Sequence, residues 1–271
     1  MPLFPKEFGV ILKNVWQKRI TFATMMHLDK QKEWFSTWFD SPFYHVLYDE
    51  RNDQEANEFL NNLVALLNPE PGSGALDLAC GAGRHSRALA SHGLKVSGCD
   101  LSPNSIEEAK KHSDPDLIFF VHDMREKLDE NYQYVFNLFT SFGYFEDVCE
   151  NAKVLKSVYD ALIEPGILVI DFMNAHKVVR DLRSRQEIKK CDILFHIKKE
   201  VVNGRIIKTI AFEYQGESYF FQEKVQALEL GDFEKLLSEA NFEIQQLAGN
   251  YKLETFDLEQ SDRLILICKK K

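Results

Sequence analysis

Short apolar runs alternate with amphipathic stretches through the middle of the chain. Five runs have the length of buried strands, at residues 75–79, 95–99, 117–121, 134–139 and 167–172. Apolar positions recur at helical spacing between most of them, at residues 83–92, 103–112 and 151–162. Strands that alternate with short helices are typical of βαβ units. The pattern therefore predicts an α/β fold built on a mostly parallel sheet.

The pattern changes after Ala175. From about residue 192 to residue 228 the chain has three strand-like runs without helices between them. The pair Asn203-Gly204 suits the tight type I′ turn of a hairpin, so we expect an antiparallel insertion here. One helix and two further strands then follow, at residues 232–240, 242–248 and 263–269.

Before the sheet, residues 29–67 are expected to be helical, with a break near Ser41-Pro42. The first 26 residues are poor in acids, and both a targeting peptide and a packed N-terminal extension fit them. We expect one compact chain with three parts, namely an N-terminal helical cap at 1–70, a core at 71–175 plus 231–271, and an antiparallel β insertion at 176–230.

The first predicted strand ends in LDLACGAGRHS, residues 76–86. Gly81 and Gly83 lie at a turn from strand to helix, where bare backbone lets a ligand approach the amides. The turn lacks the P-loop pattern, and Ser86 stands where a dinucleotide motif prefers its third glycine. Asp77 in the same place would repel a diphosphate and attract an ammonium group. This combination favours S-adenosylmethionine, which has an ammonium group and a nucleoside but no phosphate.

Two more acids follow the next two strands. Asp100 ends VSGCD, where a carboxylate can accept both ribose hydroxyls. Asp123 follows FFVH, where it can accept from the adenine amino group with Met124 against the ring. A single Asp at a strand end often only caps a helix. Three at successive strand ends fall on the one edge where open α/β sheets bind ligands.

Composition narrows the class of partner. Hydrophobic residues make up 45% and charged residues 28% of the 271 positions, and the formal charge is -9. A negative balance disfavours a long nucleic-acid backbone as partner. The five cysteines are odd in number and never spaced as CxxC, which predicts a reducing, cytoplasmic compartment. No run approaches the roughly 20 apolar residues of a membrane span, and the histidines lack metal-binding spacing. We expect a monomer or homodimer without a metal.

Three segments, LDLACGAGRHS, GCDLSPNSIEEAKK and HDM, resemble the successive motifs of class I S-adenosylmethionine-dependent methyltransferases. NLFTSFGYF and EWFSTWFDSPFYHVLY resemble a bacterial-like branch that acts on small molecules. The resemblance implies a Rossmann-like sheet of seven strands in the order 3-2-1-4-5-7-6. Helices cover both of its faces, and its last strand, at 263–269, is antiparallel.

The resemblance also assigns the methionine end of the cofactor. It places Asp77 near the ammonium group, directly or through water. Ala79 and Gly81 would line the methionine moiety, and the backbone of Leu138 or Phe139 after the fourth strand would face the ammonium.

At the nucleoside end, the same resemblance gives Asp100 the ribose and puts Leu101 beneath the adenine. Asp123 and Met124 would hold the adenine edge. Gly83 completes the expected cofactor-binding set because it ends the bend at the helix start.

Candidates on the acceptor side come from three segments. His176, after the fifth strand, is the best-placed histidine for a general base, although a solvated loop position also explains it. Tyr144 is expected to wall the acceptor pocket and act there, with core packing as the alternative. Tyr48 and Arg51 are candidates for a lid, with Arg51 or a Tyr hydroxyl on the cofactor carboxylate, and helix packing also explains them.

We therefore expect an S-adenosylmethionine-dependent methyltransferase with S-adenosylhomocysteine as product. In-line displacement would place the methyl group on an oxygen or nitrogen of a small molecule. Three alternatives stay open: an RNA or protein methyltransferase, a non-catalytic S-adenosylmethionine-binding protein on the same fold, and a nicotinamide oxidoreductase. The first rests on a basic cluster, Lys189, Lys190, Lys198, Lys199, Arg205 and Lys208.

Overall fold

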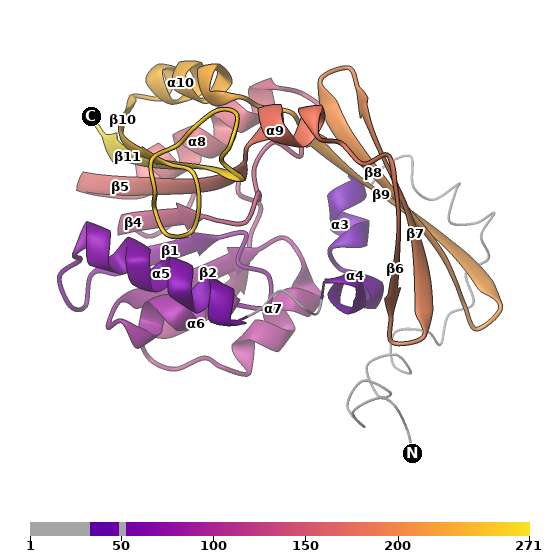
Figure 1. Ribbon diagram of the computed structural model, residues 1–271. Coiled ribbons are helices and arrows are strands. Elements are labelled where there is room, and N and C mark those ends of the chain that lie inside the picture. The colour runs from indigo at the N-terminus through magenta and orange to yellow at the C-terminus, as the bar shows by residue number, and fades with distance from the viewer. Residues whose placement is uncertain (1–32, 49–52) are drawn as a thin grey trace. The chain divides into compact units, whose positions relative to one another are not determined.

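The computed structural model describes residues 33–48 and 53–271 (Figure 1). It divides the chain into two compact units, and each unit is built from two separate segments. Among the described residues, the large unit comprises 53–181 and 225–271. The small unit comprises 33–48 and 182–224.

The large unit is built on a seven-stranded sheet in the order β10-β11-β5-β4-β1-β2-β3. Neighbours from β3 to β5 run parallel, and β11 runs antiparallel to both β5 and β10. This is the order 3-2-1-4-5-7-6 with the last strand reversed, so the predicted fold class is confirmed. The strands are β1 (Gly74–Leu78), β2 (Lys95–Asp100), β3 (Leu117–Val121), β4 (Tyr132–Asn137), β5 (Leu162–Met173), β10 (Phe242–Ala248) and β11 (Arg263–Lys270).

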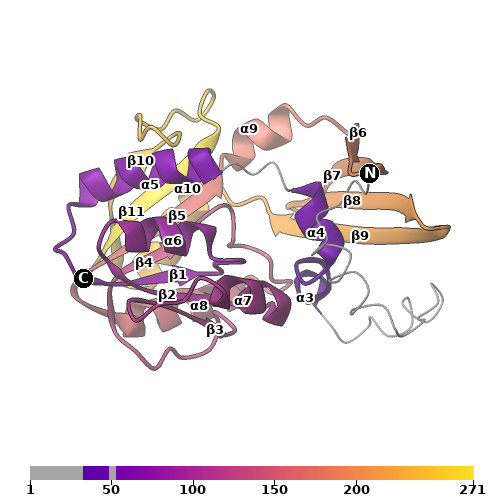
Figure 2. The same ribbon diagram turned by 90° about the horizontal axis from the view of Figure 1, so that it is seen from below.

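Helices pack on both faces of this sheet. Phe59 of α5 and Leu89 of α6 share one apolar core with Val169 of β5, and these two helices lie side by side (Figure 2). Phe172 lies an odd number of positions further along β5, so it points to the opposite face. There it packs edge-on against Phe233 of α10 at 5.2 Å between ring centroids. The helices are α5 (Asp53–Leu67), α6 (Arg84–Ser91), α7 (Pro103–Lys110), α8 (Cys149–Ala161), α9 (Ala175–Arg180) and α10 (Leu230–Glu239).

Local sequence decides where two of the helices begin. The Ser102 hydroxyl accepts the N–H of Ser105 at 3.1 Å, and Pro103 takes the first position of α7. A capping hydroxyl followed by proline is a strong helix start. Ser41 caps α4 (Pro42–Leu47) in the same way, so the break expected near Ser41-Pro42 is the start of a new helix.

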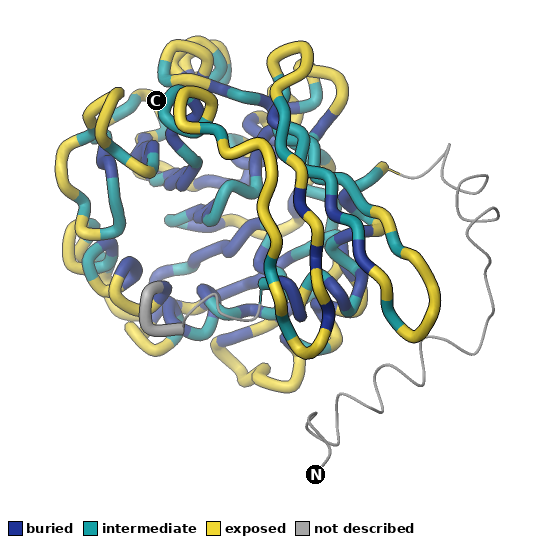
Figure 3. Tube along the Cα trace, turned by 45° about the vertical axis from the view of Figure 1, so that its right-hand side comes forward, coloured by how far each residue is buried: buried dark blue, intermediate teal, exposed yellow. Residues whose placement is uncertain are grey.

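Two glycines let α6 lie close to the sheet. A Cβ at Gly83 would lie 2.7 Å from the ring of Phe119. A Cβ at Gly98 of β2 would lie 2.6 Å from the same ring and 2.9 Å from Oγ of Ser86. Both separations are shorter than non-bonded contact, so only bare backbone fits between the ring and the helix. The strands β1, β2 and β11 are buried along most of their length, whereas the edge strands β3 and β10 are partly exposed (Figure 3).

The small unit is a four-stranded sheet in the order β6-β7-β8-β9, packed with α3 (Trp34–Trp38) and α4. Trp38 and Phe43 from the helices share one core with Phe195 and Phe212 from the sheet. The turn between β7 and β8 has φ of 50° at Asn203 and 71° at Gly204. Type I′ turns require positive φ at both central positions, so the predicted hairpin is confirmed.

The sequence pattern predicted three strands in the insertion, and the structure has four. The additional strand is β6 (Arg185–Lys190), whose side chains are mostly exposed. Its sequence RQEIKK therefore shows no apolar alternation, although Ile188 lies opposite Phe195 in the antiparallel pair with β7. The other strands are β7 (Ile193–Val202), β8 (Arg205–Tyr214) and β9 (Glu217–Gln226).

The two units divide the chain at other positions than the expected boundaries at 70, 175 and 230. Helix α5 contacts α6 and belongs to the large unit. Gln226, at the end of β9, is anchored there as well, because its N–H donates to the carbonyl of Gly143 at 2.8 Å. The acid-poor first 26 residues lie outside the described residues. Across the described part of the chain, no helix combines the length and the apolar content that crossing a membrane requires.

Candidate functional site

The bend after β1 holds three residues in the left-handed backbone region. The φ angles are 65° at Ala79, 55° at Gly81 and 78° at Gly83. The N–H of Cys80 donates to the carbonyl of Cys99 at 2.9 Å, which ties the bend to the end of β2. A Cβ built on Gly81 would meet no atom of the described residues within 4 Å. The bend therefore presents open backbone at the start of α6.

Asp100 ends β2, and two backbone amides fix its carboxylate. The N–H of Gly81 donates to Oδ2 and the N–H of Ser102 donates to Oδ1, both at 2.8 Å. A carboxylate has about four lone-pair sites, and these two amides occupy one on each oxygen. The carboxylate is thus held in place beside the bend.

Asp77 lies inside β1 with only 1% of its surface exposed. Its Oδ2 accepts the hydroxyl of Ser86, the third residue of α6, at 2.6 Å. Burial raises the pKa of Asp77 to about 6, against the opposing effect of the Ser86 hydrogen bond. A buried carboxylate of this kind is stabilised by a cation brought next to it. The local field at the bend is therefore suited to an ammonium group.

Asp123 follows β3 and is engaged by Arg125. The guanidinium lies 2.6 Å from Oδ2 through Nη2, and it also reaches Glu150 at 3.3 Å. Burial raises the pKa of Asp123, but the hydrogen bonds and charge of Arg125 outweigh this and hold the pKa below its ordinary value. The lowered pKa favours the ionised form of Asp123. Asp123 and its neighbour Met124 are both half-buried.

The turn after β4 continues the same edge, because β4 pairs with β1. Leu138 is buried, and its carbonyl accepts the hydroxyl of Ser141 at 2.8 Å. Phe139 and Thr140 both have φ of 61°, an uncommon conformation for residues other than glycine. The guanidinium carbon of Arg84, the first residue of α6, lies 5.5 Å from the centre of the Phe139 ring. The bend after β1 and the turn after β4 are thus neighbours.

A fourth acid, Asp171, lies near the end of β5 and was missed by the sequence reasoning. It is 1% exposed and accepts from Arg263 at 2.7 Å, from the Tyr251 hydroxyl at 3.2 Å and from the N–H of Phe139 at 2.9 Å. The rule that flagged the other acids, a carboxylate at the end of a parallel strand, would also have found Asp171. No sequence signal indicated Arg263 or Tyr251.

The acceptor-side candidates lie on two separate segments. The Tyr144 hydroxyl donates to the carbonyl of Thr140, so it closes the loop after β4. His176, the second residue of α9, has Nε2 at 3.0 Å from Glu259 and Nδ1 at 3.8 Å from Glu229. His176 is one third exposed and borders two carboxylates.

Tyr48 belongs to the small unit, where its hydroxyl donates to Glu223 at 2.5 Å and also contacts Lys208. Trp38 donates to the same carboxylate at 2.8 Å. These contacts place Tyr48 in a polar cluster of its own unit. Arg51, the other lid candidate, lies outside the described residues.

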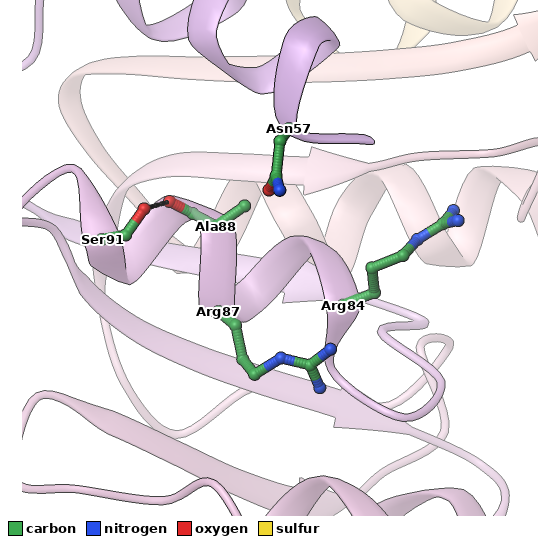
Figure 4. A pocket seen from close by; sticks show the side chains of 5 residues that line it. All are labelled: Asn57, Arg84, Arg87, Ala88 and Ser91. Atoms are coloured by element: carbon green, nitrogen blue, oxygen red, sulfur yellow. Dashed lines mark hydrogen bonds between the residues drawn. The ribbon is translucent and has the colours of Figure 1, made fainter. Parts of the chain in front are cut away.

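A hollow of about 250 Å³ lies between α5 and α6 and is lined by Asn57, Arg84, Arg87, Ala88 and Ser91. Asn57 points from α5 toward α6, while Arg84 and Arg87 leave α6 in different directions (Figure 4). Arg87 donates to the carbonyl of Ala82 at 3.2 Å. The basic groups do not converge on one point, so this hollow has no arranged ligand site.

The edge groups fit S-adenosylmethionine. Asp77 suits its ammonium, and Asp100 suits its ribose diol. Asn137, 2% exposed at the end of β4, donates to the carbonyl of Leu78 at 3.1 Å, yet its Oδ1 lacks a partner among the described residues. A buried acceptor without a donor costs about 1–3 kcal/mol, so a donor from a ligand or water suits this position. The described residues contain no group of three or more His, Cys, Asp or Glu that could hold a metal ion.

Known proteins match this chain along most of its length. A family described as "Methyltransferase domain" matches residues 69–226. The "Putative methyltransferase YqeM" of Bacillus subtilis (strain 168) is 26% identical over 87% of this chain and 96% of its own. A dTDP-3-amino-3,4,6-trideoxy-alpha-D-glucopyranose N,N-dimethyltransferase of Streptomyces venezuelae is 29% identical over 47% of this chain and 54% of its own. A solved S-adenosylmethionine-dependent methyltransferase of Clostridium acetobutylicum ATCC 824 has a TM-score of 0.72 and 17% identity, covering 84% of this chain and 96% of that one.

Proposed function

The chain belongs to the family of methyltransferase domains, and from that premise we propose that it methylates an oxygen or nitrogen atom of a small molecule with S-adenosylmethionine. The observation that carries the cofactor is the Asp100 carboxylate, which Gly81 and Ser102 hold at 2.8 Å. Asp100 suits the ribose of any nucleoside cofactor, so Asp77 discriminates between cofactors. The buried Asp77 would repel the phosphates of a nicotinamide dinucleotide and favours a nucleoside that carries an ammonium group.

At the nucleoside end, Asp100 would accept the ribose hydroxyls with Leu101 against the base. Asp123 shares its carboxylate with Arg125 at 2.6 Å. Arg125 donates to both oxygens of Asp123, so an adenine amino group would share one of these oxygens with Arg125. Met124 would pack on the ring. At the other end, Asp77 would balance the ammonium, and the open backbone at Gly81 would let the methionine chain lie against it.

When bound, S-adenosylmethionine supplies an electrophilic methyl group on a sulfonium. The task left to this chain is to align an acceptor atom with that methyl group, exclude water and take a proton where the acceptor must lose one. We assign the proton to His176, which Glu259 at 3.0 Å orients. Tyr144 would shape the acceptor pocket from the loop after β4.

The small-molecule acceptor is supported by two observations. One relative acts, by its name, on a nucleotide-linked amino sugar, and the formal charge of this chain is -9. The basic cluster that supported RNA is partly neutralised, because Lys198 pairs with Glu200 at 2.9 Å and Lys208 pairs with Glu223 at 3.6 Å. All five cysteines are free, which supports a reducing cytoplasm as the location.

The test measures S-adenosylhomocysteine release with panels of small amines and hydroxyl compounds, with RNA and with protein extracts. Turnover restricted to the small molecules is expected, and turnover restricted to RNA or protein would reverse the assignment of the acceptor. Binding of S-adenosylhomocysteine without any turnover would indicate a non-catalytic protein. Binding of NADH in preference to S-adenosylhomocysteine would overturn the cofactor itself.

A further inference from the structure

The turn after β4 holds two residues other than glycine in the left-handed region, which is an unfavourable backbone conformation for them. Phe139 and Thr140 both have φ of 61°, and such outliers persist only where the surroundings fix them. The N–H of Phe139 donates to Oδ2 of Asp171 at 2.9 Å. The N–H of Thr140 donates to the backbone carbonyl of the same residue at 2.8 Å. Asp171 therefore fixes both residues of the turn.

Asp171 is itself held by two side chains from distant parts of the sequence. Nε of Arg263, the first residue of β11, donates to Oδ1 at 2.7 Å. The Tyr251 hydroxyl, from the segment between β10 and β11, donates to Oδ2 at 3.2 Å. Arg263 also donates to the hydroxyl of Thr140 at 3.1 Å. Asp171 and Arg263 thus form an ion pair in which each side chain also has a hydrogen bond to a further residue. A buried ion pair requires such additional hydrogen bonds.

The turn after β4 and the carboxylate of Asp100 lie on opposite sides of β1. The strand order β4-β1-β2 puts the turn on one side of the bend at Gly81 and Asp100 on the other. The guanidinium of Arg263 lies 5.8 Å from the centre of the Phe139 ring. With its ribose at Asp100, S-adenosylmethionine would therefore extend its amino-acid end across β1 toward this turn, because β1 lies between β2 and β4.

We propose that Asp171, Arg263 and Tyr251 are positioning residues that hold the turn at 138–140 in the conformation that binds the amino-acid end of S-adenosylmethionine. The proposal rests on the proposed function. The three side chains act through the turn and need not touch the cofactor. Their contribution is selective, because it concerns the aminobutyrate part of the cofactor and leaves the adenosine part to Asp100 and Asp123.

Two ligands separate this role from general stabilisation. S-adenosylhomocysteine carries the amino-acid end, whereas 5′-methylthioadenosine has the same nucleoside and sulfur without it. The Kd of both is measured by calorimetry for the full chain and for Tyr251→Phe, Arg263→Lys and Asp171→Asn. Tyr159→Phe is the matched control, since the Tyr159 hydroxyl donates only to the carbonyl of Lys271 at the surface.

The expected result for Tyr251→Phe and Asp171→Asn is at least about fivefold weaker S-adenosylhomocysteine binding, the order of one lost hydrogen bond to a charged group. Binding of 5′-methylthioadenosine should change less than about twofold. Arg263→Lys keeps the charge and should fall between wild type and Asp171→Asn. With substrates, the KM for S-adenosylmethionine should rise while the KM for the acceptor stays unchanged.

Tyr251→Phe keeps the ring stacked on Phe59 at 4.5 Å, so it tests the proposal even where Asp171→Asn fails to fold. Equal weakening of both ligands, or no weakening of either, would overturn the positioning role. A wild-type protein that binds neither ligand would overturn the proposed function and this inference with it.

Discussion

Asp77 and Asp100 are carboxylates at the same edge of the sheet, but their surroundings stabilise the ionised form to different extents. Backbone amides at 2.8 Å stabilise Asp100 in its ionised form before any ligand binds. Asp77 accepts hydrogen bonds from Ser86, including one from its hydroxyl at 2.6 Å, and burial raises the pKa of Asp77 to about 6. Without a cation beside it, an ionised Asp77 is a cost to the fold. Such local costs are typical of binding sites.

We expect Asp77→Asn to stabilise the ligand-free protein at neutral pH while weakening cofactor binding. Because the pKa in the folded state, about 6, exceeds the reference value of 3.8, the native state binds more protons between these values. The free energy of unfolding of the wild type should therefore fall as pH rises through this window, by about 3 kcal/mol relative to Asp77→Asn. Urea titrations at about pH 4 and about pH 8 measure it.

Asp160→Asn on the exposed side of α8 is the control for this comparison, and it should follow the wild-type pH profile. The explanation is wrong if Asp77→Asn also follows that profile. The same variant should bind S-adenosylhomocysteine about tenfold more weakly at neutral pH, since it loses the charge opposite the ammonium.

Asp100→Ala should weaken S-adenosylhomocysteine binding at least about tenfold, which is the order of a lost hydrogen bond to a charged group. The variant removes the acceptor of two hydroxyls and also the partner of the Gly81 and Ser102 amides. Calorimetry measures the change, with Asp116→Ala as control because Asp116 is largely exposed. An unchanged Kd would remove the main support for the cofactor site.

The predictability of the site differs from residue to residue. Asp77, Asp100 and Asp123 each lie at or next to the carboxyl end of a strand beside a recognisable motif, so strand topology alone gathers them at one edge. Arg263 reaches Asp171 across 92 positions of the sequence, and no local pattern records such a pairing. The same is true of Arg125, which reaches from Asp123 to Glu150 of α8. Contacts between distant elements are set by packing, which the sequence pattern does not display.

At the scale of elements, the close approach of α6 to the sheet determines where the bend after β1 lies. Gly83 and Gly98 leave room for the ring of Phe119, and Ser86 on the same helix holds Asp77. The position of the acid therefore depends on packing between a helix and two strands. We expect that adding one methyl group at this interface shifts α6 and thereby the residues of the binding site.

Gly98→Ala should destabilise the large unit by about 1–3 kcal/mol, the usual cost of overpacking. Its new Cβ would lie 2.6 Å from the ring of Phe119 and 2.9 Å from Oγ of Ser86. Adding Phe119→Leu in the same chain should recover part of the loss, because it removes the ring from the clash. Gly231→Ala in α10 is the control, since a Cβ there would meet open space.

The free energy of unfolding is measured for the wild type, Gly98→Ala, Phe119→Leu and the double variant, and the four values form a double-mutant cycle. Strictly additive effects of Gly98→Ala and Phe119→Leu would contradict the packing explanation. The Gly231 control should change stability by less than about 0.5 kcal/mol or raise it slightly, because alanine favours the helix.

Elements with strong periodicity were predictable, and elements shaped by pairing were not. The helix start at Ser102-Pro103 and the hairpin at Asn203-Gly204 follow from local chemistry and appear as expected. Strand β6 escaped prediction because its polar side chains face solvent and only its pairing with β7 makes it a strand. Helix α5 packs against α6 of the large unit, a contact between elements that composition cannot indicate.

On the scale of the whole molecule, each unit has a core of its own. Val135 and Phe136 of β4 are buried with the large sheet, whereas Phe195 and Phe212 are buried with the helices of the small unit. Each core joins segments that are distant in sequence. Units with separate cores can open separately, with different free energies.

Phe212→Ala should therefore loosen the small unit and leave the large unit intact. Its ring is 3% exposed and packs against Phe43, Phe195 and Tyr219 at 4.7–5.0 Å between centroids, so truncation should cost about 3–5 kcal/mol. Hydrogen exchange followed by mass spectrometry should show faster exchange in peptides from 33–48 and 185–223 and unchanged protection in β1, β4 and β5. Binding of 5′-methylthioadenosine should persist, because its expected contacts lie in the large unit.

Phe136→Ala is the reciprocal variant and should reverse both outcomes. Faster exchange spread over both units in both variants would mean that the chain unfolds as one cooperative body.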